Sequence, residues 1–239
     1  MQCRMAIASA CLVACGRFDF DDLPRADARA DASDPRLGPC PGSVLFEDTF
    51  DIAGPAPLWR ISSMSSPIPV TETNSELQFD LAGPFTGETY KGYRTLARYP
   101  IAELCLVVEV TQVPTGNTTS AYFKLFDTTR VAEVFFFNNG SERELTSRTQ
   151  VNATGGAGTV DHYVVTTHDP TAHRYWRLHH SAGWTYWDAS SDGIQFVELS
   201  RLDSVFLEVD AFVEIGAGAE TAIVDGGIAG FAHLTANGP

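Results

Sequence analysis

The region that most constrains the fold runs from Asp203 to Ile215, where apolar and polar side chains alternate with a period of two residues. The odd positions are all apolar, whereas the even positions are Ser, Phe, Glu, Asp, Phe and Glu. Because successive side chains of a β-strand point to opposite faces of a sheet, this pattern predicts a strand with one face in a core. The opposite face would carry Phe206 and Phe212 beside acidic side chains.

The same period recurs from Ser43 onward, and turn-forming residues separate the segments. Leu104, Leu106, Val108 and Val110 predict a second core face, with Cys105 on the opposite side of that strand. Further strand candidates are Val44–Phe50, Leu77–Leu81, Ala121–Asp127, Val131–Phe137, His162–Thr167, His173–His179, Trp184–Ala189, Gln195–Leu199 and Ile228–Thr235. About a dozen short strands without an intervening helix predict one all-β domain over residues 43–239, an antiparallel two-sheet jelly-roll sandwich.

The N-terminus has the features of an export signal. Residues 1–14 contain one arginine followed by a ten-residue run of small or apolar side chains, which is about 15 Å long as a helix and too short to span a bilayer. The sequence Leu12-Val-Ala-Cys15-Gly16 resembles the lipobox of bacterial lipoproteins. The resemblance implies cleavage before Cys15, lipidation of Cys15, and anchoring in the cell envelope, at the outer membrane, in the periplasm or on the cell surface. The alternative is an ordinary secretory signal with an incidental cysteine.

Residues 15–42 follow as a stretch rich in Asp, Ala, Arg and Pro, which we expect to be a flexible tether. Cleavage and lipidation would leave two cysteines, Cys40 and Cys105, in an oxidising compartment. They could form a disulfide across a loop of about 65 residues, stabilising the fold by roughly 4 kcal/mol. The alternative is two separate free thiols.

The net charge of the chain limits the classes of molecule that it is expected to bind. The formal net charge is -14 and the pI is about 4.7, so phosphate backbones and anionic headgroups would be repelled. Nucleic acid is therefore not expected as a partner. No histidine spacing typical of a metal site is present, and no glycine loop that would cradle phosphate, so neither a metal nor another cofactor is predicted.

Three segments together resemble the concanavalin A-like lectin/glucanase superfamily. The segment from His173 to Phe196 has a strand of the form His-x-Tyr-x-Arg-Leu, a turn, and a second strand ending in Ser-x-Asp-Gly before an aromatic residue. The domain opens on Phe46-Glu-Asp-Thr-Phe50 with a later Trp59, and it closes with Ile215-Gly-Ala-Gly and a final strand. The resemblance covers about residues 44–235. It implies a curved jelly roll whose concave face often holds carbohydrate, although the fold alone does not fix the function.

Catalysis by this superfamily would require a pair of carboxyl groups. Glucanases of this fold usually carry Glu-x-Asp-x-Glu or Glu-x-Asp-x-x-Glu on one strand. The nearest match here, Glu208-x-Asp210-x-x-x-Glu214, has a longer spacing and a phenylalanine at position 212. This pattern favours a solvated acidic face over a catalytic dyad, so no catalytic residue is assigned.

A binding site would use aromatic faces together with charged groups that hydrogen-bond sugar hydroxyls. If the relevant strands are neighbours on one sheet, they would form such a groove from Tyr122, Lys124, Tyr175, Arg177, Tyr186, Phe206, Glu208, Asp210 and Phe212. The alternative is that the aromatic residues simply form the core, above all Trp59, Trp176 and Trp187. Three functions stay open: a non-catalytic binding module for carbohydrate, a glycoside hydrolase or lyase of the same fold, and a structural or adhesion lipoprotein that binds a protein.

Overall fold

The computed structural model describes residues 39–51, 54–62, 66–151, 158–203 and 210–239. Among these residues every regular element is a strand. The predicted signal peptide, Cys15 and most of the predicted tether lie outside the described residues. In the described part of the chain, no helix is long and apolar enough to cross a membrane.

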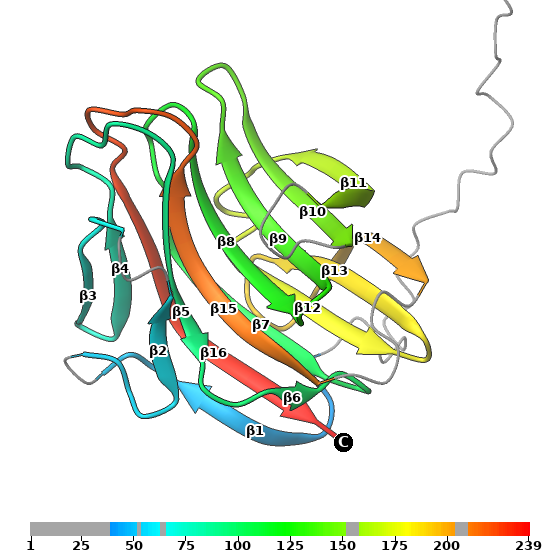
Figure 1. The fold of residues 1–239 in the computed structure, drawn as a ribbon. Coiled ribbons are helices and arrows are strands. Elements are labelled where there is room, and N and C mark those ends of the chain that lie inside the picture. The colour runs from blue at the N-terminus through cyan, green and yellow to red at the C-terminus, as the bar shows by residue number, and fades with distance from the viewer. Residues whose placement is uncertain (1–38, 52–53, 63–65, 152–157, 204–209) are drawn as a thin grey trace, which may run out of the picture. The chain divides into compact units, whose positions relative to one another are not determined.

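The strands form two antiparallel sheets of eight strands each, which confirms the predicted two-sheet sandwich (Figure 1). We call them the groove sheet and the back sheet. The groove sheet has the order β11-β10-β9-β8-β15-β5-β2, with β6 on β15; its strands are β2 (Trp59–Ser62), β5 (Thr89–Thr95), β6 (Tyr99–Pro100), β8 (Thr119–Phe126), β9 (Arg130–Asn138), β10 (Arg143–Val151), β11 (Thr159–Thr167) and β15 (Asp210–Ala219). The back sheet has the order β14-β13-β12-β7-β16-β4-β3, with β1 on β16; its strands are β1 (Ser43–Asp48), β3 (Val70–Thr73), β4 (Glu76–Asp80), β7 (Cys105–Gln112), β12 (Tyr175–Ser181), β13 (Trp184–Ser190), β14 (Val197–Asp203) and β16 (Ile228–Gly238).

The core between the sheets follows the alternation seen in the sequence. Ala211, Val213 and Ile215 of β15 are fully buried, as are Leu106 and Val108 of β7. The three tryptophans predicted to be core residues, Trp59, Trp176 and Trp187, are buried as well. Burial of apolar side chains at about 25 cal/mol per Å² is the main force that holds the two sheets together.

The expected continuous strand from Asp203 to Ile215 is wrong. Asp203 ends β14 on the edge of the back sheet, whereas Asp210 begins β15 near the middle of the groove sheet. Residues 204–209 between them, including Phe206 and Glu208, lie outside the described residues. The alternation in the sequence is a local property and does not reveal where a chain passes from one sheet to the other.

Cys40 and Cys105 form a disulfide, with 5.5 Å between their Cα atoms. Cys105 lies on the outward side of β7, as its place opposite the core residues predicted. The side-chain amide of Asn237 donates a hydrogen bond of 3.0 Å to the carbonyl of Cys40, so the segment before β1 is held against the outer surface of the back sheet. The alternative of two separate free thiols is excluded.

Candidate functional site

A row of alternating charges crosses the outward face of the groove sheet. Arg94, Glu214, Lys124, Glu133 and Arg148 lie on β5, β15, β8, β9 and β10, and each is directly opposite the next in the strand register. We call these five residues the charged row. Opposite charges in directly facing positions stabilise a sheet by about 0.2–1 kcal/mol per pair, so the row helps to fix the register of the central strands.

The two carboxylates of the charged row are buried but not fully occupied. Lys124 Nζ lies 2.9 Å from Glu214 Oε1, and Arg148 Nε donates a hydrogen bond of 2.6 Å to Glu133 Oε1. In the described part of the chain, no hydrogen bond reaches the Oε2 atom of either glutamate. Each carboxylate therefore keeps one oxygen that can accept a hydrogen bond from a ligand hydroxyl.

Tyr122 lies beside the charged row and is held by it. Its hydroxyl donates a hydrogen bond of 2.9 Å to Glu214 Oε1. The ring lies over Gly216, where an added Cβ would meet the tyrosine oxygen at 2.4 Å, so glycine in β15 creates the space that the ring occupies. Burial, and then the nearby Glu214 carboxylate, raises the pKa of the Tyr122 hydroxyl well above its usual value, so this group stays protonated as a donor.

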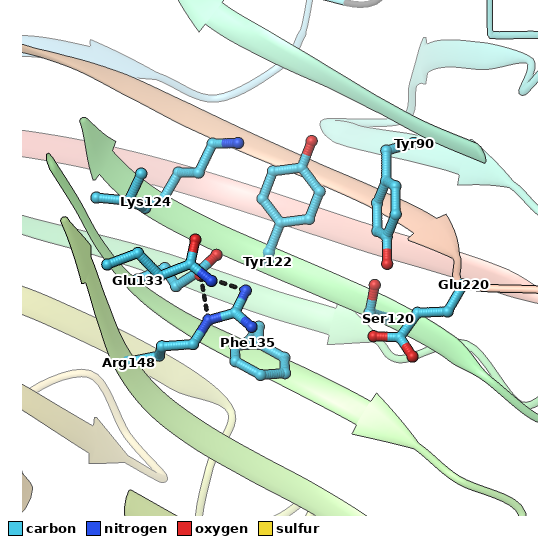
Figure 2. A pocket seen from close by; sticks show the side chains of 10 residues that line it. Tyr90, Ser120, Tyr122, Lys124, Glu133, Phe135, Arg148 and Glu220 are labelled. Atoms are coloured by element: carbon cyan, nitrogen blue, oxygen red, sulfur yellow. Dashed lines mark hydrogen bonds and ion pairs between the residues drawn. The ribbon is translucent and has the colours of Figure 1, made fainter. Parts of the chain in front are cut away.

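A hollow of about 350 Å³ opens next to these residues on the same face (Figure 2). Figure 2 shows Tyr90, Tyr122 and Phe135 around it, together with the ion pair between Glu133 and Arg148. Burial raises the pKa of Tyr90 to about 12, so its hydroxyl also stays protonated. The residues that line the hollow are Tyr90, Ser120, Tyr122, Lys124, Val131, Glu133, Phe135, Arg148, Gln150 and Glu220.

Beyond Lys124, which lines the hollow, lies an aromatic pair on the same face, Phe126 and Phe212, whose ring centroids are 5.6 Å apart. The guanidinium of Arg94 lies 4.9 Å from the centroid of Phe212, and that of Arg98 lies 4.8 Å from the same centroid. Lys124 Nζ lies 5.3 Å from the centroid of Phe126. Cations over aromatic rings are attracted by the ring quadrupole, and this attraction holds the arginines at one end of the face.

The structure divides the residues that the sequence singled out for ligand binding. Tyr122, Lys124, Asp210 and Phe212 lie on the groove sheet and point outward, so they share one face. Tyr175, Arg177 and Tyr186 lie on β12 and β13 of the back sheet, so the single nine-residue groove does not form. The two sets have similar residue types, and the prediction of one groove is wrong because local sequence patterns carry no information on which sheet a strand joins.

Arg177 and Tyr186 belong to a closed cluster on the outward side of the back sheet. Arg177 is 1% exposed and Asp188 is 2% exposed, and Arg177 Nε donates a hydrogen bond of 2.8 Å to Asp188 Oδ2. Phe196 stacks on the Arg177 guanidinium at 4.1 Å, and Tyr186 stacks on His179 at 4.5 Å. These five residues, the back cluster, are packed against each other and offer little surface to a ligand.

Sequence reasoning missed most of the lining of the hollow. Glu133 and Phe135 lie on a strand that was predicted, but its outward face was not considered. Tyr90 and Arg148 lie on β5 and β10, which were not predicted as strands because Thr, Gly, Arg and Gln dilute their apolar alternation. The alternate positions Glu-x-Glu-x-Thr-x-Arg, ending at Arg148, and Tyr-x-Gly-x-Arg, ending at Arg94, are a weak signal that becomes informative only when the order of strands in the sheet is known.

The carboxylates of the expected acidic face are also distributed differently. Asp210 is exposed, but Glu214 is 5% exposed and is bound by Lys124 and Tyr122, so it is not part of a solvated face. The glucanase motifs Glu-x-Asp-x-Glu and Glu-x-Asp-x-x-Glu occur nowhere in the sequence. Among the described residues, no group of three or more His, Cys, Asp or Glu side chains is placed to hold a metal ion.

Comparison with known proteins gives similarity of fold only. No protein-family model matches the chain, and no curated protein matches it in sequence. The structure is similar to the catalytic domain of an endo-1,3-β-glucanase (laminarinase) from Thermotoga petrophila RKU-1, with a TM-score of 0.60 and 9% identity, over 81% of this chain and 96% of that one.

Two further solved structures give the same result. A glycosyl hydrolase family 16 protein from Mycobacterium smegmatis has a TM-score of 0.57 and 15% identity, over 81% of this chain and 100% of that one. The endo-β-1,3-glucanase from Pyrococcus furiosus has a TM-score of 0.59 and 8% identity, over 81% of this chain and 93% of that one. At such identities the likeness establishes a concanavalin A-like jelly roll, and the side chains have to be judged on their own chemistry.

Proposed function

We propose that the outward face of the groove sheet binds a polysaccharide, and that it does so without cleaving it. The observation that carries this proposal is the charged row beside Tyr122, where the buried carboxylate of Glu133 lines an aromatic hollow with one oxygen free, and Glu214 holds the Tyr122 hydroxyl beside it. Sugars are bound by such combinations, because aromatic faces cover their apolar C–H surfaces while carboxylates accept hydrogen bonds from hydroxyls. The glucanases of similar fold support carbohydrate as the ligand class.

The test is binding of the purified protein to a panel of polysaccharides, beginning with laminarin, by isothermal titration calorimetry. We expect Glu133→Gln to weaken binding about tenfold, because the amide presents a donor where the carboxylate accepts. Glu198→Gln on the back sheet is the matched control, since Glu198 lies on the other sheet and is ion-paired with exposed Arg201. Equal loss in both variants, or no binding to any polysaccharide, would contradict the proposal.

A second candidate, a glycoside hydrolase, is favoured by two observations. The similar solved structures with the names above are enzymes that act on glucans. Glu133 and Glu214 also lie two strands apart, which places their backbones about 10 Å from each other and compares with the 6.5–9.5 Å between the carboxyl groups of inverting enzymes. Against it, each carboxylate already forms an ion pair with a neighbouring side chain, Glu214 with Lys124 and Glu133 with Arg148.

The same preparation separates the two functions. Release of reducing ends from laminarin that is lost in both Glu133→Gln and Glu214→Gln would establish the hydrolase. Binding without any release of reducing ends supports the binding module.

We also propose that the chain is exported and anchored in the cell envelope through a lipid on Cys15. The disulfide between Cys40 and Cys105 supports an oxidising compartment. Metabolic labelling with a radioactive fatty acid tests this, with Cys15→Ser as the variant that should lose the label. A labelled Cys15→Ser protein, or an unlabelled wild type, contradicts lipidation at this residue.

A further inference from the structure

One end of the groove face concentrates positive charge in an otherwise acidic protein. Arg60 on β2 lies directly opposite Arg94 on β5, and Arg98 follows β5 and lies over Phe212. We call these three residues the arginine end. The whole chain has a net charge of -14 and only 16 basic residues, so three arginines on one part of one face are not explained by composition.

These arginines have no acidic partner in the described part of the chain. Glu214 faces Arg94 in the strand register, but its ion pair is with Lys124. Asp210, on the same side of β15, forms no ion pair with Arg98 there. The Nε atom of Arg94 is buried and has no hydrogen-bond partner.

Like charges in directly facing positions destabilise a sheet, and a buried guanidinium N–H without an acceptor adds a further penalty. The arrangement of Arg60 opposite Arg94 therefore costs stability in the free protein. The aromatic ring of Phe212 offsets part of this cost by contacting Arg94 and Arg98 at 4.9 and 4.8 Å. A bound anion would neutralise the repulsion between the guanidinium groups.

The arginine end is continuous with the proposed saccharide site. Arg94 is the terminal member of the charged row, and Phe126, which lies under Lys124, also lies 5.8 Å from the Arg94 guanidinium. A chain lying across the strands would cover about 4.8 Å for each strand it crosses, so a few sugar units reach from the hollow to the arginines. A ligand in the hollow would thus bring its next substituents to this end.

We propose that the arginine end recognises an anionic group, a carboxylate or a sulfate ester, on the saccharide that occupies the groove face. This rests on the proposed function and assigns the ligand to anionic polysaccharides. Planar guanidinium groups hold carboxylates and sulfates through paired hydrogen bonds, and neutral hydroxyls gain less from them. Anionic membranes are disfavoured because they would meet the acidic remainder of the protein over a larger surface than a single polysaccharide chain does.

The experiment compares polysaccharides that differ in charge on one backbone. Titrations of the full chain with laminarin and with sulfated laminarin measure the preference for sulfate, and polygalacturonate tests carboxylate. We expect at least one anionic polymer to bind about tenfold more tightly than laminarin, with a preference that falls as salt is raised. Arg60→Gln combined with Arg98→Gln, which leaves the charged row intact, should remove most of the preference and leave laminarin binding within about twofold.

Two controls keep the result specific. Arg201→Gln removes an exposed arginine of the back sheet and should leave the preference unchanged. Arg94→Lys retains the charge without the planar fork and should retain part of the preference. Circular dichroism establishes that each variant is folded.

The outcomes distinguish the two proposals. Equal binding of neutral and anionic laminarin, or a preference that survives in the double variant, overturns the proposal that the arginine end recognises an anionic group. The proposed saccharide site on the groove face is kept in that case. Binding to vesicles of anionic lipid that depends on the same arginines also overturns the saccharide assignment. Absence of binding to every polysaccharide overturns both proposals.

Discussion

The two outward faces of the sandwich use the same residue types with opposite results. The groove face combines Tyr122 with a glutamate and a lysine, and it opens into a hollow of about 350 Å³. The back cluster combines Tyr186 with an aspartate and an arginine, and the hollow beside it measures only about 100 Å³. Composition therefore does not decide whether such a face binds a ligand.

What decides the difference is what lies over each face. Phe196 stacks on Arg177, and the disulfide brings Cys40 and Pro41 to the edge of the back cluster. On the groove face, glycines of β15 and β5 let Tyr122 lie flat, and the described residues place no such cover over the hollow. We therefore expect variants of the back cluster to change stability and variants of the groove face to change binding.

The largest effect is expected from Arg177→Met, which leaves Asp188 buried without its guanidinium partner. Removing one member of a buried ion pair costs about 3–5 kcal/mol, because the remaining carboxylate loses its permanently charged partner and keeps His179 Nε2 at 3.1 Å. Urea denaturation should show this loss, and polysaccharide binding should be unchanged. Arg148→Met on the groove face is the matched variant and should cost only about 1–2 kcal/mol, since Glu133 borders the hollow and can reach water.

The double variant Arg177→Met, Asp188→Leu separates charge from packing. It removes both charges, so we expect it to recover most of the stability that Arg177→Met loses. Equal costs for Arg177→Met and Arg148→Met would show that the two faces do not differ in the way proposed.

The next effect concerns the disulfide that holds the N-terminal segment to the back sheet. Replacing Cys40 and Cys105 together with serine removes a constraint that closes a loop of 65 residues in sequence separation. The expected loss is about 4 kcal/mol of unfolding free energy, mainly because the unfolded chain gains freedom. Denaturation of the wild type with and without a reductant should give the same difference, and a loss below about 1 kcal/mol would contradict the role of the bridge.

The contrast between the faces also shows how far the sequence could be interpreted. Alternation over Ala211, Val213 and Ile215 predicted core residues correctly, and the position of Cys105 opposite Leu104 and Leu106 correctly placed it on an outer surface. These are local properties, set by the pleat of one strand. The division of Tyr122 from Tyr186 between two sheets depends on pairings between distant strands, which the pleat does not encode.

The charged row illustrates the same limit. Arg94, Lys124 and Glu214 come from three strands spread over about 120 positions of sequence, and only the register of β5, β15 and β8 brings them side by side. Each has an unremarkable neighbourhood in the sequence. A site of this kind is a product of sheet order, and so it could be named only in part before the structure was known.

Gly216→Ala tests whether the open face is preorganised. The added methyl group would lie 2.4 Å from both the Tyr122 oxygen and the Lys91 carbonyl, so the ring or the strand has to move. Overpacking of this kind costs about 1–3 kcal/mol. We also expect weaker polysaccharide binding, because the hydrogen bond from Tyr122 to Glu214 is displaced. Gly87→Ala is the control, since no atom lies near its added methyl group; a loss of binding there as well would exclude a specific effect at Tyr122.

An effect on stability of the same size as that of Gly216→Ala is expected from acid, through protonation of a buried histidine on the core side of the groove sheet. His168, just after β11, packs edge-on against buried Phe136 at 4.9 Å, and burial lowers its pKa from 6.5 to about 4. Because the folded-state pKa is the lower one, the stability that the neutral ring provides is complete above pH 6.5 and is lost as the pH falls toward 4. The loss should be about 1–3 kcal/mol, measured as unfolding free energy at pH 7 and pH 4. In His168→Gln this part of the pH dependence should disappear, and an unchanged pH profile would place the acid sensitivity elsewhere. Groove binding measured at the same two pH values would then report on the ligand site itself, since the fold of the His168→Gln variant should respond less to acid over that range.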